Sequence, residues 1–169
     1  LGLVTALGND VTTCWANLIA GKSGAGIITH FDSSKFKTQF ACEVKDLDVS
    51  NLFDPKELRR YDRYIHLAVK SAEEAINNAG LHIQQEDPLR CGVIYGSGMG
   101  GVKTLDTNIG EFGAGDGTPR YSPFFIPMII TNMAAGMLAI RYGFKGANYA
   151  TTSACSSSSR AIANACYQI

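Results

Sequence analysis

The residue best suited to covalent chemistry in this sequence is Cys155, because of where it stands in the pattern of predicted elements. Residues 147–152 have the composition of a strand, and the residues from Ser156 onward have the spacing of a helix. Cys155 lies at the junction between them. A side chain at a strand-to-helix turn is held out at the edge of the sheet, which is where several enzyme classes present a nucleophile.

The start of a helix offers this cysteine two kinds of help. Helix N-termini carry unsatisfied N–H groups and a partial positive charge, and both favour a thiolate over a thiol. A backbone N–H at the same place can donate a hydrogen bond to an oxyanion that develops during acyl transfer. One turn therefore offers a nucleophile together with part of the stabilisation that its reaction needs.

A free cysteine is more often a small buried hydrophobic residue than a nucleophile. The cysteines to which we give that simpler interpretation are Cys14, Cys91 and Cys166. Cys155 differs from them because its neighbours are small: Ala154 precedes it, and four serines at 156–159 follow it. Small neighbours leave open space around the sulfur, so we interpret Cys155 as reactive.

The five cysteines do not form a recognisable metal or disulfide pattern. Their number is odd, they are widely spaced, and no pair has the C-x-x-C spacing. Zinc sites need clustered ligands, and disulfide frameworks belong mainly to small secreted domains. We therefore expect no metal site, and we expect a reducing compartment in which the thiols are mostly buried and inert.

A glycine run at residues 96–101 is the second candidate for chemistry. It follows a predicted buried strand at 91–95 and precedes a predicted helix from Val102, and Gly96, Gly98 and Gly101 have the spacing of a dinucleotide-binding fingerprint. One alternative is therefore an NAD(P)-dependent oxidoreductase. The fingerprint also needs a second strand that ends in an acidic residue, whereas Glu111 and Asp116 have no strand before them. The simpler interpretation is a tight turn packed against the sheet.

Basic residues form the third feature. Lys56, Arg59, Arg60 and Arg63 are spaced at i, i+3, i+4 and i+7, so a continuous helix would place all four on one stripe. Acidic residues stand close by in the sequence. On charge pattern alone, a solvated helix face is therefore the simpler interpretation.

The elements that must position these residues alternate between strands and helices, which favours an α/β fold. The remaining predicted elements are the end of a strand at 1–4, a helix capped within Gly8-Asn9-Asp10 and ended by Gly21, a strand at 38–44, a helical start at Asp54-Pro55, a helix from Asp62 to Gly80, a loop at 110–118 and a helix at 131–142. The inner faces are predicted at Ile65, Ala68, Val69, Ala72, Ala75, Ile76 and Ala79 of one helix and at Ala161, Ile162, Ala165 and Ile169 of the last.

Composition limits the possible functions. The chain has 169 residues, 15 basic and 15 acidic, so its formal net charge is +0, and no basic excess predicts nucleic-acid binding. A content of 46% hydrophobic and 18% charged residues argues against intrinsic disorder. No apolar run approaches the ~20 residues of a membrane span. We expect a single domain over residues 1–169 that is truncated at both ends, because it opens without Met and stops inside a predicted helix.

The motif Ser153-Ala154-Cys155-Ser156-Ser157 resembles the nucleophile signature of the β-ketoacyl-acyl-carrier-protein synthases, and the resemblance is closest to synthase II. Other segments match that family in the same order: residues 1–8, Ser23-Gly24, His30-Phe31-Asp32, residues 96–101, Ser122-Pro123-Phe124-Phe125-Ile126-Pro127 and residues 132–136. The resemblance implies the N-terminal half of a thiolase-like fold with α-β-α-β-α layers, of which this half would hold a mixed sheet and flanking helices. Ser158 and Ala6 depart from the usual Gly and Pro.

The resemblance also implies a reaction. An acyl chain would pass from acyl carrier protein to Cys155 as a thioester, and the carbanion from decarboxylated malonyl-carrier protein would attack it to give a 3-oxoacyl product of fatty acid biosynthesis. No cofactor is implied. The family's two catalytic histidines belong to the other half of the fold, so none of this chain's three histidines is assigned to those roles. A second alternative is a non-catalytic partner subunit, which would lack the cysteine.

The resemblance further assigns binding roles to individual positions. It implies substrate-binding residues, which are Met99, Phe125 and Ile126. It implies docking of acyl carrier protein, a small acidic protein, at Lys56, Arg59, Arg60, Arg63 and Arg120. It also implies a homodimer that works in the cytoplasm, or in a plastid or mitochondrial matrix in a eukaryote, without nucleic acid or membrane as a partner.

Overall fold

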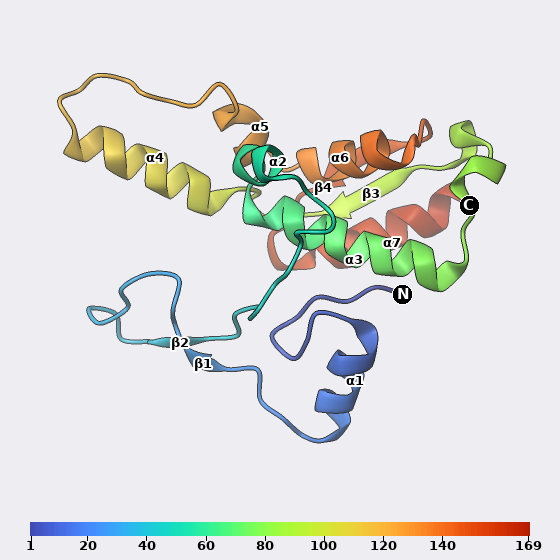
Figure 1. Cartoon of the computed structure of the whole chain (residues 1–169), viewed down its shortest axis with the longest axis horizontal. Coiled ribbons are helices and arrows are strands. Elements are labelled where there is room, and N and C mark those ends of the chain that lie inside the picture. The colour runs from blue at the N-terminus through green and yellow to red at the C-terminus, as the bar shows by residue number, and fades with distance from the viewer. The chain divides into compact units, whose positions relative to one another are not determined.

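A computed structural model describes residues 1–169. Figure 1 follows the chain through its helices and strands. The residues fall into two compact units, of which the first comprises Leu1–Asn51 and Lys70–Leu81 and the second comprises Leu52–Val69 and His82–Ile169. A single domain over residues 1–169 stays a prediction.

The first unit contains helix α1, Val11–Ile19, and an antiparallel pair of short strands, β1 (Gly26–Ile27) and β2 (Phe40–Ala41). The carboxylate of Asp10 caps α1 by accepting the Thr13 N–H at 2.7 Å and the Thr13 hydroxyl at 2.8 Å. Gly21 follows the helix with a φ of 64°, a left-handed conformation that favours glycine. The predicted helix and both of its end signals are confirmed.

Two strand predictions in this unit need correction. Residues 1–4 form no strand. They are held instead by side chains of helix α3, because the Leu3 N–H donates to the carboxylate of Glu74 at 2.9 Å. The strand predicted at 38–44 shrinks to β2, since only Phe40 and Ala41 pair with β1. At residues 1–4, hydrogen bonds to side chains take the place of the backbone hydrogen bonds of a strand. An apolar sequence pattern does not distinguish these two arrangements.

The second unit holds most of the regular structure. Its elements in chain order are α2 (Pro55–Arg60), the start of α3 (Arg63–Ala79), the 3₁₀ turns η1 (Ile83–Gln85) and η2 (Pro88–Arg90), β3 (Val93–Gly96), α4 (Val102–Ala114), α5 (Phe125–Ile129), α6 (Met133–Tyr142), β4 (Asn148–Thr151), the 3₁₀ turn η3 (Ala154–Ser156) and α7 (Ser157–Gln168). The strands and helices predicted around the glycine run and around Cys155 are confirmed.

Strands β3 and β4 are parallel, with Val93 opposite Asn148 and Gly96 opposite Thr151. The chain between them runs through α4, α5 and α6, as a crossover between parallel strands requires. Both α6 and α7 pack on both strands, and Figure 1 shows the strand pair between these helices. Because the strands are parallel, the glycine run after β3 and the cysteine segment after β4 leave the same edge of the pair.

The α/β class is confirmed, but the strands do not form one mixed sheet. The antiparallel pair β1–β2 and the parallel pair β3–β4 are separate sheets. Each residue of β3 is half-buried rather than fully buried as predicted.

The core of the second unit forms where α3 and α6 supply small or branched apolar residues. Ile65 and Val69 are completely buried, and so are Ala134 and Ala135 of α6. On the predicted inner face of α3, Ala68 is also buried, whereas Ala72, Ala75 and Ile76 are half-buried and Ala79 is exposed. The prediction for Ala79 is wrong because it stands at the end of the helix, where the last turn leaves the packed region.

The predicted inner face of α7 is only partly correct. Ala161 is buried and Ala165 is half-buried, but Ile162 and Ile169 are exposed. Consecutive helical residues are about 100° apart, so a helix that packs through Ala161 turns Ile162 away. Ile169 lies beyond the last helical residue.

Helix α4 continues through a segment that was predicted to be a loop. Gly110 and Gly113 lie inside this helix, which ends at Ala114. A glycine in a helix costs only about 1 kcal/mol relative to alanine, so two isolated glycines need not end a helix. The loop predicted from residue 110 is therefore wrong up to Ala114.

None of the helices combines the length and the apolar character that a membrane span needs.

Strand β3 and the start of α7 approach each other closely at Gly96. A Cβ atom added to Gly96 would lie 2.5 Å from the Cα of Ser158 and 2.6 Å from the carbonyl carbon of Ser157. Real Cβ atoms essentially never come so close to backbone atoms, and backbone cannot move aside as a flexible side chain can. Gly96 is therefore required for β3 and α7 to pack at this distance.

We expect Gly96→Ala to lower the free energy of unfolding by about 1–3 kcal/mol, because the added methyl must displace the start of α7. Chemical denaturation of the intact protein measures this. Gly110→Ala is the matched control, since nothing lies within 4 Å of a Cβ at that helical position. It should raise stability by up to about 1 kcal/mol. Equal effects at the two glycines would contradict the packing argument.

His66 is a titratable group in the core of the second unit. Its ring packs edge-on against Phe53, with ring centroids 4.9 Å apart, and its Nε2 is buried without a hydrogen-bond partner. Burial lowers the pKa of His66 below its usual value, although the negative charge of nearby Asp62 opposes that shift. The neutral ring is therefore the form that the folded state prefers.

This lowered pKa predicts a pH dependence of stability. An unfolded histidine takes up its proton near pH 6.5, but the folded protein takes it up at lower pH. The free energy of unfolding should therefore fall as pH drops below about 6.5, and this contribution should level off below the folded pKa. Urea denaturation between pH 7.5 and 5 measures the slope. His66→Gln should flatten it, whereas His82→Gln, at an exposed position, should not. Identical slopes in both variants would contradict this role for His66.

Candidate functional site

Cys155 lies in the short turn between β4 and α7. The 3₁₀ turn η3 contains it, and two hydrogen bonds close that turn: the Ser156 N–H donates to the Ser153 carbonyl at 3.1 Å, and the Ser157 N–H donates to the Ala154 carbonyl. The Cys155 N–H makes neither of these bonds. The cysteine side chain is exposed. The predicted position at a strand-to-helix junction is confirmed, with one 3₁₀ turn inserted before the helix.

The residue before the cysteine has an unusual backbone conformation. Ala154 has a φ of 48°, and it is one of two non-glycine residues in the chain with a positive φ. The left-handed conformation costs an ordinary residue roughly 1–2 kcal/mol. Such strain persists only where surrounding contacts hold it, and it is common at turns that present a nucleophile.

Ser157 supplies the contacts that hold this turn. Only 2% of its surface is exposed. Its hydroxyl donates to the carbonyl oxygen of Ala154 at 2.7 Å and accepts the N–H of Ser153 at 2.9 Å. Its own carbonyl accepts the hydroxyl of Thr151, the last residue of β4, at 2.9 Å. The backbone on the N-terminal side of Cys155 is thus tied to the first residue of α7. The sequence does not reveal this role of Ser157 and Thr151, because their hydrogen-bond partners come within reach only in the folded turn.

The glycine run lies next to this turn. A Cβ at Gly98 would be 3.7 Å from the carbonyl oxygen of Ala154, and the β3–β4 ladder continues as the Ser97 N–H donates to the Thr151 carbonyl at 3.1 Å. Gly100 has a φ of 69°, and a Cβ there would collide with the carbonyl of Ile129. These glycines therefore make room for the chain's own backbone.

The same geometry removes support from the dinucleotide alternative. The strand parallel to β3 is β4, and it ends at Thr151 rather than at an acidic residue. Glu111 lies in helix α4, and Asp116 lies in the segment that follows it. The simpler interpretation of the run, a tight turn packed against neighbouring backbone, describes what the structure shows.

The three predicted substrate-binding residues lie on two adjoining segments. Met99 belongs to the glycine run, and 72% of its surface is exposed. Phe125 and Ile126 begin α5, and the end of that helix contacts the run, because the Gly101 N–H donates to the carbonyl of Ile129 at 3.2 Å. The structure thus brings the segments that carry these residues together with the Cys155 turn.

The predicted basic stripe is interrupted. Lys56, Arg59 and Arg60 lie on α2 and are exposed, but α2 ends at Arg60 because Tyr61 is extended. Asp62 then starts a new helix by accepting the Tyr64 N–H at 3.2 Å. Arg63 therefore belongs to α3, and a single helical stripe over residues 56–63 is wrong.

Asp62 is a site residue whose importance the sequence did not reveal. It is 7% exposed, and its carboxylate also accepts the Thr104 hydroxyl at 2.6 Å and the Thr104 N–H at 3.2 Å. This contact joins the start of α3 to the start of α4, directly after the glycine run. Nothing in the sequence pairs Asp62 with a threonine 42 residues later.

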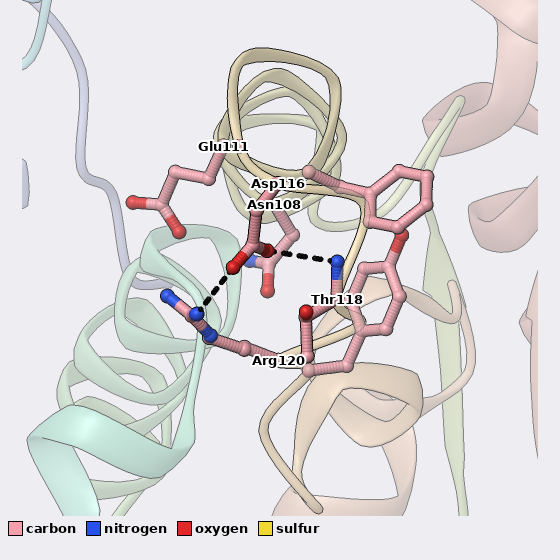
Figure 2. A pocket seen from close by; sticks show the side chains of 8 residues that line it. Asn108, Glu111, Asp116, Thr118 and Arg120 are labelled. Atoms are coloured by element: carbon pink, nitrogen blue, oxygen red, sulfur yellow. Dashed lines mark hydrogen bonds and ion pairs between the residues drawn. The ribbon is translucent and has the colours of Figure 1, made fainter.

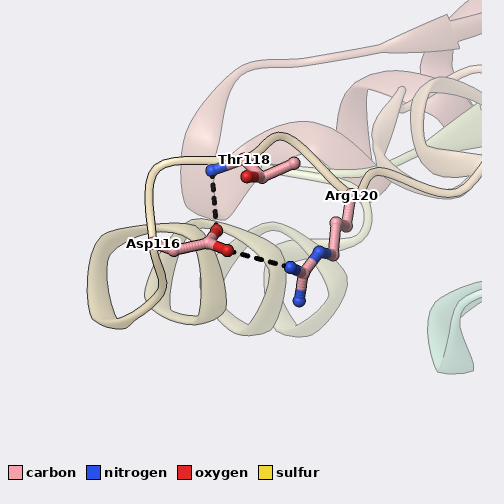
Figure 3. Close-up of polar contacts among 3 residues, drawn as sticks. All are labelled: Asp116, Thr118 and Arg120. Carbon is pink, nitrogen blue, oxygen red and sulfur yellow. Dashed lines mark hydrogen bonds and ion pairs between the residues drawn. The ribbon is translucent and has the colours of Figure 1, made fainter.

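Two of the cationic side chains have partners within the second unit. The guanidinium carbon of Arg60 lies 4.9 Å from the centroid of the Phe124 ring. Arg120 pairs with Asp116 at 3.0 Å, and Figure 3 shows that Asp116 also accepts the N–H of Thr118. That backbone hydrogen bond lowers the pKa of Asp116, which keeps its carboxylate charged.

A pocket of about 280 Å³ surrounds this ion pair. Figure 2 shows the polar side chains that converge on it from α4 and from the loop that follows. Its lining residues are Asn108, Glu111, Phe112, Gly115, Asp116, Thr118, Arg120 and Tyr121. Arg120 is the one predicted site residue here, and the pocket contains neither Cys155 nor the predicted substrate-binding residues.

All five cysteines are free, and their environments differ. Cys14 is buried, and its thiol donates to the carbonyl of Gly8 at 3.1 Å, which confirms its structural role. Cys166 is exposed rather than packed, so the structural interpretation is wrong there. Cys91 is half-buried and Cys42 is exposed, so the expectation of mostly buried thiols is wrong. Exposure alone therefore does not distinguish Cys155; its constrained turn does. No three His, Cys, Asp or Glu side chains are grouped closely enough to hold a metal ion.

Comparison with known proteins gives a consistent result. A family model described as "Beta-ketoacyl synthase, N-terminal domain" matches residues 1–169. The chain is 41% identical over 169 residues to 3-oxoacyl-[acyl-carrier-protein] synthase 2 of Coxiella burnetii, covering 100% of this chain and 41% of that protein. It is 42% identical over 165 residues to the enzyme of the same name from Synechocystis, covering 98% of this chain and 39% of that protein.

A solved structure described as the ishigamide ketosynthase/chain length factor has a similar backbone. The TM-score is 0.79 at 25% sequence identity, and the match covers 90% of this chain and 38% of that chain. In each comparison the chain spans about two fifths of the protein that it matches.

Proposed function

We propose that this chain, which belongs to the β-ketoacyl synthase family and matches its N-terminal domain, carries the acyl-accepting cysteine of a 3-oxoacyl-acyl-carrier-protein synthase. The observation that carries the proposal is the position of Cys155 in a strained turn at the start of α7. Two relatives about 40% identical over the matched region bear that enzyme name. Because the chain spans about 41% of the first, the activity is proposed for the whole protein.

The proposed reaction has two transfers. In the first, the Cys155 thiolate attacks the carbonyl carbon of an acyl-carrier thioester, the carbonyl oxygen gains negative charge, and the carrier leaves as its thiolate. In the second, malonyl-carrier protein loses carbon dioxide, and the resulting carbanion attacks the Cys155 thioester. The product is a 3-oxoacyl-carrier protein, and the Cys155 thiolate is regenerated. Sulfur suits both steps because it is a good nucleophile and a good leaving group.

The turn can stabilise the first transfer electrostatically. The Cys155 N–H makes neither hydrogen bond of its own 3₁₀ turn and is therefore available to the oxygen of the reacting thioester. A donor held in place before reaction contributes more than one that must reorient. The family resemblance assigns the histidines that assist decarboxylation to the rest of the protein, so His30, His66 and His82 have no role in this proposal.

We assign the acyl chain to the surface that carries Met99, Phe125 and Ile126. Met99 is exposed on the run beside the Cys155 turn, and 56% of Ile126 is exposed on the adjoining helix. A flexible thioether can adapt its shape to an apolar chain. These positions would therefore control which acyl chains reach the sulfur.

We assign the acidic carrier protein to the cationic side chains on and near α2. Lys56, Arg59 and Arg60 are exposed on that helix, and attraction over distance would steer an acidic partner toward it. Arg63 and Arg120 would extend the docking surface from α3 and from the loop before α5. The ion pair of Arg120 with Asp116 makes its contribution the smallest, because a docking partner must compete with that carboxylate.

The finer features of the fold belong to this proposal as well. They are the thiolase-like layering α-β-α-β-α, completed by the rest of the protein, and a homodimer. The layering is supported by the parallel pair β3–β4 packed between α6 and α7, which would form one of the sheet layers and its flanking helices. The homodimer rests on the family resemblance.

Acylation of one cysteine tests the proposed function directly. When the intact protein is incubated with acyl-carrier thioester, the acyl group should appear on Cys155 in mapped peptides. Cys42 and Cys166 are internal controls because they are also exposed. Cys155→Ser should reduce acyl transfer by several orders of magnitude, and Cys166→Ser should not. Acyl groups found mainly on Cys42 or Cys166, or normal turnover by Cys155→Ser, would overturn the proposal.

Charge reversal tests the docking surface. Lys56→Glu combined with Arg59→Glu should raise the KM for acyl-carrier substrates on the order of tenfold at low salt, because an acidic partner would meet repulsion. The increase should shrink in added salt, which screens exposed charges over about 10 Å. Arg60 is left intact because its stacking on Phe124 would confuse packing with docking.

The control for this experiment is the double variant Lys35→Glu/Lys37→Glu, which changes net charge equally at exposed positions elsewhere. It should leave the KM unchanged. Alkylation of Cys155 by iodoacetamide, which involves no carrier protein, should be unaffected in both variants. If alkylation and carrier-dependent transfer fell together, α2 would be a solvated face with a structural role only.

A further inference from the structure

The orientation of one peptide group decides where the Cys155 N–H points. That N–H shares its peptide plane with the carbonyl of Ala154. The chain contains no cis peptide bonds, so the two groups point in opposite directions across the plane. Any contact that fixes the direction of the Ala154 carbonyl therefore also fixes the direction of the Cys155 N–H.

Ser157 holds that carbonyl from two sides. Its N–H donates to the Ala154 oxygen as part of the 3₁₀ turn, and its hydroxyl donates to the same oxygen at 2.7 Å. The hydroxyl cannot turn away without loss, because it also accepts the Ser153 N–H at 2.9 Å. With 2% of the residue exposed, water is not available as a replacement partner for these groups.

The conformation that Ser157 holds is not one that the local backbone prefers. Ala154 is left-handed, with a φ of 48°. Without an external tie, an alanine would relax toward ordinary φ values, and the peptide plane ahead of Cys155 would rotate with it. The hydroxyl therefore does more than satisfy a buried polar group.

We propose that Ser157 is a positioning residue for the nucleophile: its hydroxyl holds the Ala154 carbonyl so that the Cys155 N–H stays directed at the oxygen of the reacting thioester. This inference rests on the proposed function, because it assumes that Cys155 accepts an acyl group. It assigns Ser157 no contact with substrate. Ser157 acts on the reaction only by fixing the orientation of the peptide group between Ala154 and Cys155.

Two reactions of the same sulfur separate this role from a general packing role. Acyl transfer builds negative charge on the thioester oxygen, so it depends on the Cys155 N–H. Alkylation by iodoacetamide displaces iodide and builds no such oxyanion, so it reports only the exposure and ionisation of the sulfur. A positioning role predicts that losing the hydroxyl slows the first reaction selectively.

The experiment uses the full-length enzyme and the variants Ser157→Ala and Ser157→Thr, with Ser159→Ala as an exposed control. Ser157→Ala should lower the rate constant of Cys155 acylation about 10-fold, less than the ~100-fold or more that loss of an oxyanion donor itself costs. The KM for the acyl carrier and the alkylation rate should stay within about twofold of the wild type. Ser157→Thr keeps the hydroxyl and should recover most of the acylation rate.

The other outcomes are equally decisive. Acylation by Ser157→Ala at the wild-type rate would overturn the proposal, and so would an equal loss of acylation and alkylation. If Ser157→Ala does not fold, the double variant Ala154→Gly/Ser157→Ala replaces it, because glycine adopts the left-handed conformation without strain. The double variant should show the same selective loss, and normal acylation by it would refute the role. Failure of wild-type Cys155 to accept any acyl group would instead refute the proposed function.

Discussion

The contact on which the site depends is the close approach of β3 to the first turn of α7. Gly96 ends β3 directly against the backbone of Ser157 and Ser158, where no side chain fits. The parallel ladder holds Gly96 opposite Thr151, and the hydroxyl of Thr151 binds the carbonyl of Ser157. The ends of two strands and the start of one helix are therefore packed together here. The turn that carries Cys155 connects β4 to α7.

This convergence explains why the turn can remain strained. A left-handed alanine is unfavourable by itself, and the neighbouring hydrogen bonds of Ser153 and Ser157 offset that cost. Cys155 lies in this turn, before α7 begins, and its N–H makes neither of the turn's hydrogen bonds.

The charged side chains of the second unit differ in burial: one carboxylate is buried and hydrogen-bonded, whereas the cations of α2 are exposed. Asp62 is buried, and its carboxylate accepts hydrogen bonds from the N–H and the hydroxyl of Thr104. These bonds fix the start of α4 directly after the glycine run. The cationic side chains of α2 are exposed. Arg60, the last residue of that helix, stacks on the ring of Phe124. The buried carboxylate joins the starts of two helices, whereas the cations of α2 are exposed to solvent.

The sequence by itself determined the local features: the caps of α1 and α2, the strand and helix on either side of Cys155, and the family motif at residues 153–157. These depend on neighbours within a few positions, so spacing and residue type are sufficient to predict them. Tertiary structure decided the rest. The break at Tyr61 divides the basic residues between two helices, and Ile162 faces solvent. The tie between Ser157 and Ala154 likewise depends on a left-handed residue that becomes favourable only when β3, β4 and α7 are packed together, and no local preference encodes that packing.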